Sequence, residues 1–134
     1  GVIQMKHDYG LIILRLGLGI LFVFTGVTKL FIAKPAGVTQ MLSGIGFPLP
    51  LLFAWILILA EIIGGIALLI GFKTKWTSIL LSIVMIVAII TVQINALGTD
   101  NSIQFFKDLS ILTGLIAIHI IGPGSYSLDK KHSI

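Results

Sequence analysis

The sequence predicts an all-α fold, an integral membrane four-helix bundle with a short interfacial helix between the first two spans. Two observations support this fold class. Hydrophobic residues make up 57% of the chain and charged residues only 10%, whereas soluble domains carry about 25% charged residues. The longest apolar segment, residues 49–72, is also long enough, at about 1.5 Å per residue, to cross a hydrocarbon layer about 30 Å thick. Residues 1–134 are therefore expected to form a single transmembrane domain.

The polar breaks in the hydropathy pattern separate four apolar segments. They predict spans at residues 11–31, 49–72, 76–94 and 106–121. In the first span, two charged residues share a helical stripe with small and aromatic residues: Arg15, Gly19, Phe22, Gly26 and Lys29. Glycines on such a stripe let two backbones approach closely. This face is therefore predicted to lie inside the bundle.

The segment between the first two spans, residues 32–48, is too polar to cross a membrane. Val38, Met41, Leu42 and Ile45 nevertheless recur at helical spacing within it. This spacing favours a short helix lying at the membrane interface. A structureless loop is the alternative interpretation.

The second span is unusual because it carries one ionisable side chain, Glu61, near its middle. A carboxyl group at this depth costs roughly 2.5 to 3.5 kcal/mol on insertion scales. Helical spacing stacks Glu61 over Gly64 and Gly65, so its carboxyl group is expected to face protein rather than lipid.

Glu61 needs a partner, and Arg15 is the predicted one. Measured from the inner end of each span, Glu61 lies about 16 Å deep and Arg15 about 6 Å deep, within the combined reach of the two side chains. Lys29 is expected to lie too far away. The pair has two interpretations: an ion pair that specifies the fold without chemistry, or a binding pocket or proton-handling site.

The last two spans add further polar side chains. Gln93 shares a face of the third span with Met85 and Ile89. Asp108, near the start of the fourth span, is expected either to cap that helix or to pair with Lys107 or Lys29.

Composition excludes several classes of function. The chain has no cysteine, so it forms no disulfide and no thiolate metal site. Its only histidine within a span is His119, which does not support a haem held by two histidines, and no metal-ligand cluster is evident. The net charge of +4 is spread along the chain rather than gathered in a patch, so no nucleic-acid partner is expected. No electron carrier is encoded, so the chain is not expected to be a catalyst alone.

The basic residues instead predict orientation. Lysine and arginine counts favour both termini on the cytoplasmic side of the cell membrane, with six basic residues inside and three outside. Small residues along the second span form a seam for another helix, which predicts a protein partner or homo-oligomer: Ala60, Gly64, Ala67 and Gly71.

Three segments of the chain resemble one known family. The segments LRLGLGILFVFTGVTKLF, IGFPLPLLFAWILILAEIIGGIALLIGFKTKW and IGPGSYSLD resemble, in order and spacing, those of DoxX-like membrane proteins. The resemblance implies a four-helix membrane fold, with Arg15, Lys29 and Glu61 at family motif positions. Similar proteins often carry a histidine near the outer end of the third helix, where this chain has Gln93.

The resemblance also suggests a function. The related DoxD protein is a membrane subunit of a thiosulfate:quinone oxidoreductase, so the family implies a small integral subunit that docks a redox partner and contacts quinone. A quinone head group would then be held by Arg15, Lys29, Glu61 and Gln93, with Glu61 delivering or accepting protons. The alternatives are a non-catalytic scaffold or assembly subunit of a larger complex and, less well supported because the chain has no internal repeats, a carrier of protons or small solutes.

Overall fold

Long helices dominate the computed structural model, which describes residues 1–124, 127 and 128. The four long ones are α1 (Val2–Thr28), α3 (Pro50–Ile70), α4 (Thr74–Thr91) and α5 (Ser102–Ile121). Three short ones connect them: η1 (Lys29–Ala33), α2 (Lys34–Gly44) and η2 (Gln93–Ala96). Four helical segments are long and apolar enough to cross a membrane, and α1, η1 and α2 together form the first of them. The predicted fold class is therefore confirmed.

Helices α1 and α3 approach each other most closely because glycines line their contact. A Cβ added at Gly65 of α3 would lie 2.7 Å from the backbone nitrogen of Val23 and 2.8 Å from the carbonyl oxygen of Gly19. A Cβ at Gly26 of α1 would lie 3.0 Å from the backbone nitrogen of Ile62. The predicted inward stripe of α1 is thus confirmed, and it brings the two backbones into direct contact.

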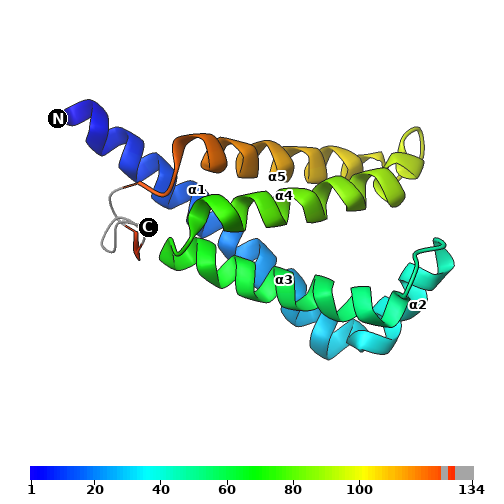
Figure 1. Cartoon of the computed structure of the whole chain (residues 1–134). Coiled ribbons are helices and arrows are strands. Elements are labelled where there is room, and N and C mark those ends of the chain that lie inside the picture. The colour runs from blue at the N-terminus through cyan, green and yellow to red at the C-terminus, as the bar shows by residue number, and fades with distance from the viewer. Residues whose placement is uncertain (125–126, 129–134) are drawn as a thin grey trace.

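The other pair, α4 and α5, lies beside the first (Figure 1). A buried hydrophobic cluster joins the two helix pairs. It contains Leu18 and Phe22 of α1, Leu68 of α3, Leu81 of α4 and Leu115 of α5. Figure 1 shows the two pairs close together near the start of α4 and further apart at the end that holds α2 and the α4–α5 connection.

The segment between the first two spans folds as predicted into a helix, α2, rather than a loop. It follows α1 through the π-helical stretch η1 and a bend at Lys34, whose φ of 66° is left-handed. Val38 and Leu42 of α2 are buried against Ala54 and Ile58 of α3. The helix therefore forms a wall of the bundle's open end.

Part of the small-residue seam predicted for a partner helix is used within the chain itself. Gly64 contacts the side chain of Leu81 on α4, and Gly71 lies beside the side chain of Arg15. Association with another protein stays a prediction. The orientation signal of Lys130 and Lys131, and positions 125, 126 and 129 of the family-like ending, lie outside the described residues.

Candidate functional site

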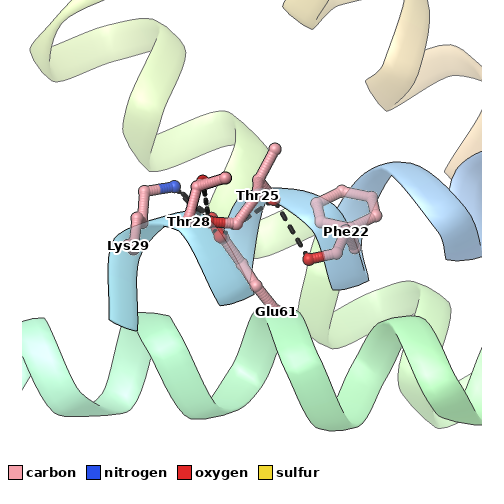
Figure 2. A network of polar contacts seen from close by, with 5 residues as sticks. All are labelled: Phe22, Thr25, Thr28, Lys29 and Glu61. Atoms are coloured by element: carbon pink, nitrogen blue, oxygen red, sulfur yellow. Dashed lines mark hydrogen bonds and ion pairs between the residues drawn. The ribbon is translucent and has the colours of Figure 1, made fainter. Parts of the chain in front are cut away.

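Glu61 of α3 is buried, with 4% of its surface exposed, and it faces protein as predicted. Figure 2 shows its carboxylate pointing toward α1, where it binds the ammonium group of Lys29. The Lys29 Nζ lies 2.6 Å from Oε1 and 2.9 Å from Oε2. The Thr25 hydroxyl lies 3.1 Å from Oε2 and equally far from the carbonyl oxygen of Phe22, so its single proton serves one of the two acceptors at a time. An acid at this depth is thereby paired on both oxygens.

The prediction that Arg15 would pair with Glu61 is wrong. Arg15 is buried near the other end of α3, where Nε donates to the carbonyl oxygen of Leu68 at 3.0 Å. Nη1 donates to the carbonyl oxygen of Pro123 at 2.6 Å. The carbonyl groups at a helix C-terminus lack partners within the helix and attract positive charge. Arg15 therefore ties the end of α3 to the segment after α5.

The physical reason is the register between α1 and α3. The prediction set the ends of the two spans level with each other, whereas the glycine contacts place Gly26 beside Glu61 and Gly19 beside Gly65. This slides the helices by about one turn. Glu61 then lies one turn from Lys29 and far from Arg15. The signal that would have given this register is the matching of small residues across the two helices, because close backbone contact requires a glycine on at least one side.

The position of Arg15 predicts that its replacement lowers the stability of the bundle without changing ligand binding. Replacing Arg15 with methionine leaves buried carbonyl groups unsatisfied and is expected to destabilise the bundle by about 2 kcal/mol. Denaturant unfolding of the detergent-purified protein measures this loss. Ligand binding by the variant that remains folded should match the wild type, and a specific loss of binding would return Arg15 to the site.

A cavity of about 400 Å³ lies between the two helix pairs, next to the Lys29–Glu61 pair. Ligand sites typically enclose about 300 to 1,000 Å³. Its polar lining comes from α1, α3 and α5 and from the short helices η1 and η2: Thr25, Lys29, Glu61, Gln93, Gln104, Lys107 and Asp108. Three of the four residues predicted to bind a cofactor, Lys29, Glu61 and Gln93, therefore share one cavity, while Arg15 does not line it.

Asp108 lines the cavity, and α5 begins earlier than predicted. The helix starts at Ser102, so Asp108 lies inside it and is not its cap. Asp108 shares the cavity lining with Lys29, Lys107 and Gln93. Pairing of Asp108 with Lys107 or Lys29 stays a prediction. Its position in one cavity with Gln93 was missed, because Gln93 lies in the η2 turn rather than in the third span.

The lining gives the cavity a balanced chemistry. The lining contains two carboxyl groups, of Glu61 and Asp108, and two ammonium groups, of Lys29 and Lys107. The remaining lining is mostly hydrocarbon, including Phe22, Leu57 and Met85. An electrically balanced cavity with both donors and acceptors suits a neutral polar group better than an ion.

The model of the DoxX family matches residues 10–94, which is most of the chain. The chain belongs to the DoxX family. It is 34% identical to "Inner membrane protein YqjF" of Escherichia coli over 92% of each chain, and 29% identical to "Inner membrane protein YphA" of the same organism over 90% of this chain and 89% of that one. No solved structure matches. This DoxX-family chain is thus a multi-pass membrane protein with relatives in a bacterial inner membrane.

One further relative carries a functional name. "Putative oxidoreductase CatD" of Bacillus subtilis is 30% identical over 90% of this chain and 83% of that protein. The match to the DoxX family model includes Arg15, Lys29, Glu61 and Gln93 and ends before Asp108.

Proposed function

We propose that this DoxX-family chain is the membrane subunit of a redox complex and that its polar cavity holds the head group of a quinone. The single observation that supports this most is the polar cavity of about 400 Å³ beside the buried Lys29–Glu61 pair. The name of the Bacillus subtilis relative is consistent with redox chemistry. A quinone head group is neutral and carries two carbonyl oxygens, which suits a balanced cavity lined by donors.

The residues have complementary roles in this proposal. The Lys29 ammonium group has three N–H donors, so a donor is left for a carbonyl oxygen when it binds the two oxygens of Glu61. The Gln93 amide supplies a second donor from the α4–α5 side. Reduction of a quinone to the quinol consumes two electrons and two protons. In this proposal Glu61 and Asp108 pass the protons, and a partner oxidoreductase supplies the electrons.

The complex would lie in the cell membrane, with both termini of this chain on the cytoplasmic side, as the distribution of basic residues favours. The cavity would then lie toward the outer side, because α1 runs outward from the N-terminus to Lys29.

The test is the substitution Glu61→Gln, which keeps the size of the side chain and its ability to hydrogen-bond. Lys29 then loses its counter-ion, and the site loses a proton acceptor. Binding of a tailless benzoquinone to the purified protein in lipid nanodiscs is expected to weaken about tenfold. Ser110→Ala, on the exposed side of α5, is the control and should bind as the wild type does.

The scaffold alternative makes a different forecast for the same experiment. A non-catalytic assembly subunit would bind no benzoquinone in its wild-type form. Its Glu61→Gln variant would change only stability or the recovery of partner proteins. Absence of saturable binding to the folded wild-type protein would therefore reject the quinone proposal.

A further inference from the structure

A second cavity, of about 240 Å³, lies between α2, α3 and α4 at the open end of the bundle. We call it the apolar groove. Its walls include Met41 and Leu42 of α2, Phe53 of α3, and Leu80 and Val87 of α4. Phe53 is held in place by an edge-to-face contact with Phe47, with ring centroids 5.1 Å apart.

The apolar groove adjoins the polar cavity. Five residues line both: Met41, Leu57, Val84, Ala88 and Val92. They come from α2, α3 and the end of α4. The two spaces are therefore neighbouring compartments, one with charged and amide side chains and one of hydrocarbon, separated only by apolar side chains.

The groove offers no unpaired side-chain polar group to an occupant. Thr91 is the polar side chain in its lining, and its hydroxyl donates to the carbonyl oxygen of Val87 at 2.7 Å within α4. A polar molecule or an extended peptide would lose hydrogen bonds to water or to itself on entering such a groove. A hydrocarbon chain would lose none.

The outer edge of the groove is formed by side chains that face away from the protein. Ile56 of α3 is 47% exposed, and Leu80 and Ile83 of α4 are 46% and 53% exposed. In a membrane-spanning bundle these side chains meet lipid. The groove therefore leads from the hydrocarbon of the bilayer toward the polar cavity.

We propose that the apolar groove holds the hydrocarbon tail of the ligand whose polar head lies in the adjoining cavity. The ligand class is then an amphiphile with a small neutral head and an isoprenoid or alkyl tail, which enters sideways from the bilayer between α3 and α4. This inference rests on the proposed function, because it assigns the tail of the same molecule. It adds that the groove is the path by which the tail leaves the cavity.

The groove contributes more to access than to affinity. A tail in the bilayer is already surrounded by hydrocarbon, so moving it into the groove gains little hydrophobic free energy. A blocked groove, in contrast, excludes a tailed ligand by steric overlap while leaving room for a head without a tail. A loss of binding by the blocked variant that affects only the tailed ligand therefore distinguishes binding in the groove from simple partitioning of the tail into the bilayer.

The experiment compares two benzoquinones that share a head, one without a tail and one with a decyl tail, in phosphatidylcholine nanodiscs. Val87→Trp fills the groove from a residue that does not line the polar cavity. Ile90→Trp, on the same helix, lines neither space and is 62% exposed, so it is the matched control. Val87→Trp is expected to weaken binding of the tailed quinone about tenfold and leave the tailless one unchanged. Ile90→Trp should alter neither.

If Val87→Trp binds the tailed quinone as tightly as the wild type does, the tail assignment is overturned and the proposed function stays intact. Absence of binding of either quinone to the wild type would overturn the proposed function itself. A second measurement avoids dependence on the folding of a variant: a diazirine at the end of the tail should label groove residues of the wild-type protein on illumination. Labelling confined to lipid-facing residues elsewhere, or a change in self-association alone in Val87→Trp, would also contradict the proposal.

Discussion

Replacing Lys29 with methionine is expected to destabilise the bundle by about 3 kcal/mol, because it leaves the buried Glu61 carboxylate without its cation. Only 6% of the Glu61 side chain is exposed, so water cannot replace the lost ammonium group. Thr25 supplies one hydroxyl contact, which is much weaker than the ion pair it accompanies. Unfolding of the detergent-purified protein by added sodium dodecyl sulfate measures the loss.

The double variant Lys29→Met with Glu61→Leu separates stability from function. It removes both charges together, so most of the lost stability is expected to return. Benzoquinone binding, in contrast, should stay about tenfold weaker than in the wild type, because the cavity has lost both a donor and an acceptor. Recovery of binding along with stability would mean that the pair serves the fold alone.

Replacing Gly65 with valine is expected to cost about 3 kcal/mol or more, since the new side chain has no space between α1 and α3. Its Cβ alone would lie 2.7 Å from the backbone nitrogen of Val23, and backbone cannot move aside as a flexible side chain can. The two helices would have to separate, and Glu61 and Lys29 would separate with them. Denaturant unfolding and loss of benzoquinone binding should therefore appear together in this variant.

Gly17→Ala is the matched control for this prediction. Gly17 lies in α1, the helix that packs against Gly65, but a Cβ at position 17 meets nothing within 4 Å. Alanine is the better helix former, so this variant is expected to be as stable as the wild type or more stable, by up to about 1 kcal/mol. A comparable loss in both variants would contradict the assignment of the cost to the contact between α1 and α3.

The sequence alone predicted the membrane character, the helical class and the burial of Glu61. These follow from local properties: the length of apolar runs, the periodicity of small residues and the cost of a carboxyl group in hydrocarbon. It also placed Lys29, Glu61 and Gln93 among the candidate site residues, and all three line the polar cavity.

The cation that pairs with Glu61 could not be predicted from the sequence, because it depends on how far one helix slides along another. A shift of about one turn exchanges Arg15 for Lys29, and it is set by backbone contacts between Gly19, Gly65 and Gly26 rather than by the ends of the spans. The tertiary structure likewise brought Asp108 to the cavity from α5, and placed a hydrocarbon groove beside it. Periodicity gives the face of each helix, but the register between helices and the space left between them emerge only from packing.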